Sequence, residues 1–91
     1  MFHVLKSTYL LPPDVVAETR PAHLEFLKAE IDAGRLLLAG RQEDGSGGML
    51  ITADISAEDV QDIVDRDPYT HARAASYERF SFSAAVQAPG I

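Results

Sequence analysis

The chain has 91 residues, which suits a single domain and leaves no room for a second core. It contains no cysteine, so disulfides, thiol catalysis and cysteine-ligated metals are excluded. The net charge is −6 and the eight basic residues are scattered, so nucleic acid and anionic membranes are poor partners.

The start of the chain predicts a strand rather than a targeting segment. Residues 1–6 lack the basic and apolar parts of a signal peptide. No run reaches the roughly 20 apolar residues of a membrane span, so we expect a soluble cytoplasmic protein. Phe2 to Tyr9 is rich in residues that suit a half-buried strand, and Pro12 and Pro13 end it.

The longest helical pattern follows, and Pro21 determines where we expect it to begin. Residues 14–19 can form a short turn, but Pro21 disfavours a continuous helix behind it. Proline is tolerated in the first turn of a helix, because its missing N–H would have no partner there. The main helix is therefore predicted to begin near Thr19 or Arg20 and to end near Ala33.

This helix should carry an apolar stripe with a histidine beside it. Leu24, Leu27 and Ile31 recur at helical spacing and predict the buried face. His23 borders that stripe, at the predicted start of the helix and near Arg20. The positive helix end and the guanidinium should favour a neutral imidazole, which can act as a base.

A hairpin and a second helix come next. Residues 35–40 and 49–53 read as two antiparallel strands, joined by a turn at Asp44-Gly45. Ser56 is the expected N-cap of the second helix, and Pro68 stops it. Its apolar stripe consists of Val60, Ile63 and Val64.

Residues 75–83 predict the last strand, after an irregular segment. The order β-α-β-β-α-β is that of a ferredoxin-like α+β fold, forming a single domain over residues 1–91. It places two helices on one face of a four-stranded antiparallel sheet. The other face would be apolar and uncovered, so we expect a homodimer in which two sheets pack face to face.

Two places in the chain combine groups that could carry chemistry. Arg20 and His23 are the first, and the alternative is a capping or interface histidine. Asp67-Pro68-Tyr69 is the second, and the alternative is an ordinary helix stop. A carboxylate at a helix C-terminus is electrostatically unfavourable, so Asp67 needs a partner, and His23 or Arg20 would serve.

The remaining candidates point to no metal or cofactor. His3 and His71 lack the spacing and the neighbouring ligands of a metal site. The glycine-rich residues 45–48 join two strands and precede no helix, so they are a turn rather than a phosphate loop.

Three segments, taken in order, resemble the YciI-like (YCII-related) family: Arg20-Pro21-Ala22-His23-Leu24, Gly34-Arg35-Leu36-Leu37-Leu38-Ala39-Gly40 and Asp67-Pro68-Tyr69. The resemblance covers most of the chain. It implies a ferredoxin-like fold whose dimers form an α/β barrel through their sheets. It also implies catalytic residues His23 and Asp67, no cofactor, and ligand-binding neighbours at Arg20, Gly40, Pro68 and Tyr69.

The resemblance also suggests a function. One such relative is a dehydrochlorinase of a chlorinated hydroxyquinol, and the superfamily includes muconolactone isomerase. We therefore expect a cofactor-independent lyase or isomerase in which His23 moves a proton, Asp67 orients it and Arg20 holds an anionic oxygen. The alternative is a non-catalytic dimeric protein that binds a small-molecule ligand in the same pocket. The connection at residues 42–48 is shorter than the family's common pattern.

Overall fold

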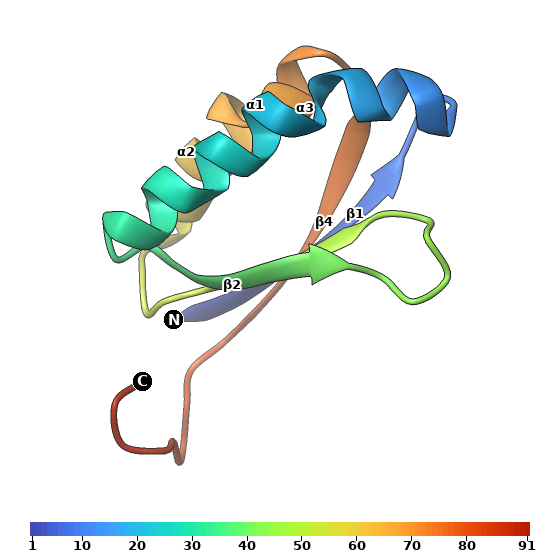
Figure 1. The fold of residues 1–91 in the computed structure, drawn as a ribbon. Helices are drawn as coiled ribbons and strands as arrows, with labels where there is room; N and C mark the ends of the chain where they lie inside the picture. The colour runs from blue at the N-terminus through green and yellow to red at the C-terminus, as the bar shows by residue number, and fades with distance from the viewer.

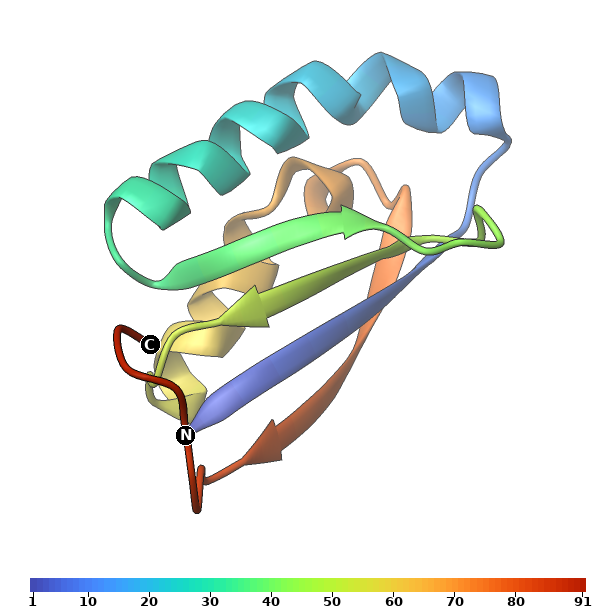
Figure 2. The ribbon, with the colours of Figure 1, turned by 60° about the horizontal axis from the view of Figure 1, so that its bottom comes forward.

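The computed structural model describes residues 1–91. Its elements are β1 (Phe2–Tyr9), α1 (Pro13–Asp32), β2 (Leu36–Arg41), β3 (Gly48–Thr52), α2 (Ala57–Arg66), α3 (Pro68–His71) and β4 (Ala75–Phe82). The strands form one antiparallel sheet in the order β2-β3-β1-β4. Both long helices lie over the same face of it (Figure 1; Figure 2). The predicted ferredoxin-like fold is confirmed. None of the helices has the length and apolar character needed to cross a membrane.

The main core lies between the helices and the sheet. Leu5 of β1 pairs with Leu50 of β3, and both side chains are buried on the helix side. They meet Leu27 of α1, Val60 of α2 and Leu36 of β2. Each such buried side chain stabilises the fold by about 1.5–3 kcal/mol.

Helix α1 begins earlier than the sequence predicts. It starts at Pro13 and not near Thr19 or Arg20, and Pro21 lies inside it. An interior proline removes a helical hydrogen bond and costs about 3 kcal/mol. Burial of Val16 offsets this cost, because the turns before Pro21 pack against α3 and β4. The cluster there contains Val16, Tyr69, Ala74 and Ala75.

The buried face of α1 also differs from the predicted stripe. Leu24 and Ile31 are 46% and 43% exposed, and of the predicted three only Leu27 is buried. The buried residues of the helix are Val16, His23, Leu27 and Glu30. His23 lies in the middle of the helix, so the expected influence of the positive helix end does not act on it.

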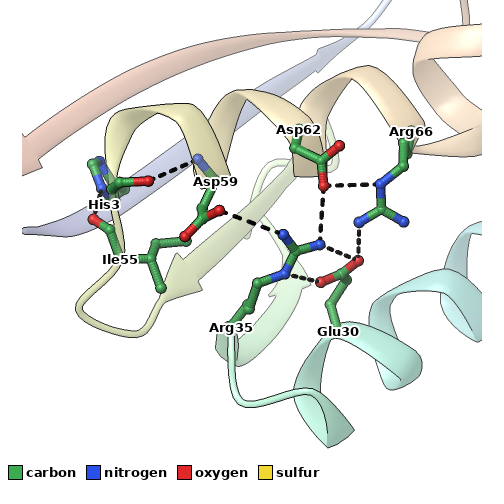
Figure 3. A network of polar contacts seen from close by, with 8 residues as sticks. His3, Glu30, Arg35, Ile55, Asp59, Asp62 and Arg66 are labelled. Carbon is green, nitrogen blue, oxygen red and sulfur yellow. Dashed lines mark hydrogen bonds and ion pairs between the residues drawn. The ribbon is translucent and has the colours of Figure 1, made fainter.

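Glu30 is buried near the end of α1, and its charge is neutralised by two arginines (Figure 3). Arg35 donates to both carboxylate oxygens at 2.8 and 2.9 Å, and Arg66 of α2 donates to one of them. Asp62 accepts from both arginines. The hydrogen bond from Arg35 is the main cause that lowers the pKa of the Glu30 carboxyl. The network joins α1, α2 and the start of β2.

The second helix begins as predicted, and a further short helix follows it. Ser56 Oγ accepts the N–H of Asp59 at 3.1 Å and caps α2. The segment predicted as irregular contains α3, whose N-cap is Asp67. The Asp67 side chain accepts the N–H of Tyr69 at 2.9 Å. Asp67 therefore ends one helix and begins the next, which offsets its unfavourable position behind α2.

The hairpin between β2 and β3 forms as predicted, and its base is fixed against β1. Gln42 donates to the carbonyl of Ser7 at 2.8 Å, and the N–H of Gly48 donates to the Ser7 hydroxyl at 2.7 Å. Gly47 lies so close to Ser7 that an added Cβ would stand 1.8 Å from the Ser7 carbonyl oxygen. Only glycine fits at position 47.

The second face of the sheet carries apolar side chains and no helix. The register places Val4, Leu38, Ile51 and Phe80 together on this face. Leu38 and Phe80 are about half exposed. This set, with the half-exposed Phe82 at the end of β4, is called the open sheet face below.

Replacing Gly47 with alanine should destabilise the protein by more than about 2 kcal/mol, because the new methyl group must displace the β1 backbone. Gly40→Ala is the matched control, since a Cβ at Gly40 meets no atom within 4 Å. Urea denaturation of both variants measures the difference. Equal midpoints would mean that the hairpin does not press against Ser7.

Candidate functional site

A cavity of about 150 Å³ lies between α1, α3 and the sheet. Its polar and aromatic lining consists of Ser7, Tyr9, Arg20, His23, Arg41, Tyr69 and Tyr77. The rest of the lining consists of Leu24, Leu27, Ala39, Gly40, Gly48 and Leu50. A pocket with a few polar groups among apolar ones is the usual form of a small-molecule site.

His23 is held by a hydrogen bond and by stacking. Its Nδ1 lies 2.8 Å from Asp67 Oδ1, and its ring stacks on Tyr69 with 3.8 Å between centroids. An ionised carboxylate can only accept, so Nδ1 carries the proton in this pair. In the neutral imidazole Nε2 is then an acceptor, and it makes no hydrogen bond within the protein. His23 is 8% exposed and lines the cavity.

Asp67 has no exposed surface and lies behind His23. Its Oδ1 accepts from His23 and from the N–H of Tyr69, and its Oδ2 accepts from the Tyr77 hydroxyl. An ionised carboxylate is costly to bury unless donors replace the lost water. These three donors, from α1, α3 and β4, replace it.

The two tyrosines next to Asp67 stay protonated. Burial, with a further contribution from the Asp67 charge, raises the pKa of the Tyr77 hydroxyl far above its ordinary value. Burial also raises the pKa of Tyr69, although the nearby Arg20 guanidinium acts in the opposite direction. Tyr77 is therefore a permanent donor to Asp67. The Tyr69 hydroxyl is buried beside the Arg20 guanidinium but makes no hydrogen bond of ordinary geometry.

The structure brings most of the predicted site residues together. Arg20, Gly40 and Tyr69 line the cavity beside His23, and Asp67 supports it from behind. Pro68 does not line the cavity. It is the first residue of α3. Its fixed φ suits the first turn of the helix that Asp67 caps.

Four further polar or aromatic residues of the cavity were missed in the sequence: Ser7, Tyr9, Arg41 and Tyr77. Strand alternation could have suggested Tyr77, because it faces the same side of β4 as the buried Ala75. The pairing register was needed to place Tyr77 opposite Ser7 and next to the site.

The other two histidines lie outside the cavity. His3 is buried and contacts Ser81 Oγ at 2.7 Å and the Ile55 carbonyl at 2.9 Å. His71 is exposed at the end of α3. No three side chains among the histidines and carboxylates gather closely enough to hold a metal ion.

Comparisons with known proteins identify a family, a solved structure of similar fold and a short related sequence. A family model of the YCII-related domain matches residues 1–83. The solved structure of 5-chloro-2-hydroxyhydroquinone dehydrochlorinase from Burkholderia phenoliruptrix, in complex with 2,5-dihydroxybenzoquinone, is similar, with a TM-score of 0.75 and 20% identity. The match covers 91% of this chain and 94% of that one, and at this identity it shows the fold alone. A 12 kDa protein of Mycolicibacterium smegmatis is 71% identical over 24 residues, which are 26% of this chain and 100% of that sequence.

Replacing Tyr77 with phenylalanine should lower the free energy of unfolding by about 2 kcal/mol at pH 7, because the buried Asp67 carboxylate loses one donor. Above pH of about 10, the unfolded tyrosine ionises while the folded Tyr77 keeps its proton. The wild type therefore loses stability above this pH, and the difference in the free energy of unfolding between the wild type and Tyr77→Phe should narrow. Urea denaturation at pH 7 and pH 11 measures both effects.

Tyr9→Phe is the control for this experiment, because the Tyr9 side chain lines the same cavity but makes no hydrogen bond to Asp67. A Tyr77→Phe variant as stable as Tyr9→Phe at pH 7 would show that the Tyr77 hydroxyl does not support the carboxylate.

Proposed function

Because this chain belongs to the YCII-related domain family, we propose that it acts on a small molecule bound in the cavity beside His23. His23 and Asp67 serve as an acid–base pair in this proposal. The observation that carries it is the contact between His23 Nδ1 and Asp67, which leaves Nε2 free to meet a ligand.

The proposed chemistry is a proton transfer at Nε2. When Nε2 takes a proton from a ligand, the imidazole becomes a cation next to the Asp67 carboxylate. The negative charge of Asp67 stabilises that cation, and Tyr77 keeps the carboxylate in position. A positioned general base of this kind contributes typically about 10²- to 10⁴-fold to a rate.

We propose that the reaction is a cofactor-independent elimination or isomerisation. The enzyme of similar fold removes HCl from its substrate, as its name states. In such a step a base takes the proton while chloride leaves with the electrons of its bond, so no oxidant or reductant is needed. Here His23 would take the proton and Arg20, which lines the same cavity, would stabilise the developing negative oxygen.

A second candidate is a non-catalytic ligand-binding or accessory protein. The burial of His23 and its stacking on Tyr69 support this alternative, since both also suit an imidazole that only holds the wall of the cavity together.

With 5-chloro-2-hydroxyhydroquinone as the trial substrate, His23→Gln should release chloride about 10²- to 10⁴-fold more slowly than the wild type. Asp67→Asn should also be slow, because the imidazolium loses its compensating charge. His71→Gln is the control, because it removes a histidine that does not line the cavity. Circular dichroism should report an unchanged fold for His23→Gln, which keeps the test valid if Asp67→Asn unfolds.

Equal rates for His23→Gln and the wild type would contradict the proposed base. Binding of 2,5-dihydroxybenzoquinone by a wild type that releases no chloride would favour the non-catalytic alternative.

We also propose that two copies pack through the open sheet face. Its members Leu38, Phe80 and Phe82 are about half exposed, and a contiguous apolar face of this kind is typical of an interface. Two sheets that pack face to face would cover it.

Phe80→Lys should convert the dimer to a monomer in light scattering, because it places a charge in the middle of the proposed interface. Ile31→Lys is the matched control, since Ile31 is 43% exposed, against 50% for Phe80, but lies on α1. A wild type with the mass of one chain, or an unchanged mass for Phe80→Lys, would contradict the proposal.

A further inference from the structure

We infer that the cavity binds a small cyclic carboxylate, and that Arg41 acts together with Arg20 to select its negative charge. The inference rests on the proposed function only in using the same cavity. It would hold for a binding protein as well as for an enzyme.

The first support is that two arginines beside the cavity have no acidic partner. Arg20 on α1 and Arg41 at the end of β2 both line the cavity. Neither forms an ion pair with a carboxylate, although the chain has 14 acidic and eight basic residues. Arg35 and Arg66, by contrast, are paired in the Glu30 network. Two unpaired guanidinium groups beside one cavity favour an anionic occupant.

The second support is the charge of the surroundings. No aspartate or glutamate lines the cavity. Asp67 has no exposed surface, and its oxygens already accept three hydrogen bonds. Two guanidinium charges against one buried carboxylate leave one net positive charge around the cavity when His23 is neutral. The charged groups that line or support the cavity are therefore net positive, with Arg41 at its exposed edge, in a protein of net charge −6.

The third support is the volume of the cavity and the apolar part of its lining. The cavity has a volume of about 150 Å³, and an apolar cavity of roughly that volume accommodates one benzene ring. Leu24, Leu27 and Leu50 supply aliphatic surface, and Tyr9 and Tyr69 supply aromatic surface. A single six-membered ring fits this space and this composition.

The fourth support is the shape of the cationic group. Guanidinium is a planar fork whose N–H groups match the two oxygens of a carboxylate. A ring packed on the apolar wall, with a carboxylate directed to the arginines, would use both parts of the lining. A neutral ring would leave both guanidinium charges without a partner, and a cationic ring would be repelled.

Benzoate and benzamide are the probes that test this inference, because they share a ring and a planar substituent and differ in charge. Titration of the full chain, followed by NMR, should show benzoate moving the resonances of His23 and Tyr69. Benzamide should bind at least about tenfold more weakly, since a hydrogen bond to a charged partner is the stronger one. Benzoate binding should also weaken as salt is added.

Arg41→Gln and Arg20→Gln should each weaken benzoate binding by about tenfold and weaken benzamide binding less, because the amide loses only a hydrogen bond to a neutral acceptor. Arg79→Gln is the matched control, because it removes the same charge from an exposed position outside the cavity. Thermal unfolding should confirm that all three variants are folded.

Equal affinities for benzoate and benzamide would overturn the charge selection, and so would benzoate that leaves His23 unshifted. An Arg41→Gln variant that binds benzoate like Arg79→Gln would remove Arg41 from the site. These outcomes are separate from the loss of chloride release in His23→Gln, which tests the acid–base pair and not the charge of the ligand.

Discussion

The buried carboxylate of Asp67 is the group on which the arrangement of the site depends. A charge with no exposed surface must be surrounded by donors, and each donor here comes from a different element. His23 extends from α1, Tyr69 offers its N–H at the start of α3, and Tyr77 reaches from β4. These three bonds fix how α1 and α3 lie against the end of the sheet. The cavity is the space left between them.

Helix α1 supplies His23 because it is held on both sides of that residue. Val16 is packed under α3 and β4 in one half of the helix. In the other half, Glu30 is bound by arginines of the neighbouring segments (Figure 3). His23 lies between these two attachments and is stacked on Tyr69 as well. The imidazole is thus placed by packing and ion pairing from distant parts of the chain, with no help from the end of its own helix.

Local signals in the sequence predicted much of the fold, and long-range contacts account for what they missed. The first strand, the hairpin at Asp44-Gly45 and the Ser56 cap depend on neighbouring residues and could be read directly. The start of α1 could not, because the turns before Pro21 are held by the packing of Val16 in the cluster with Tyr69, Ala74 and Ala75, which offsets the cost of the proline. The need of Asp67 for a partner followed from its place at a helix end. The positions of Arg41 and Tyr77 beside the cavity depend on the pairing register of the strands, which local sequence does not determine.

Asp67 also joins α2 to α3, because the oxygen that accepts from His23 caps the N-terminus of α3 as well. A lineage that lost any chemistry at His23 would still need this carboxylate to turn the chain between the two helices. An aspartate at the matching position of a related sequence is therefore evidence of a common architecture, whereas under the proposed acid–base role it is the histidine opposite it whose loss would remove activity.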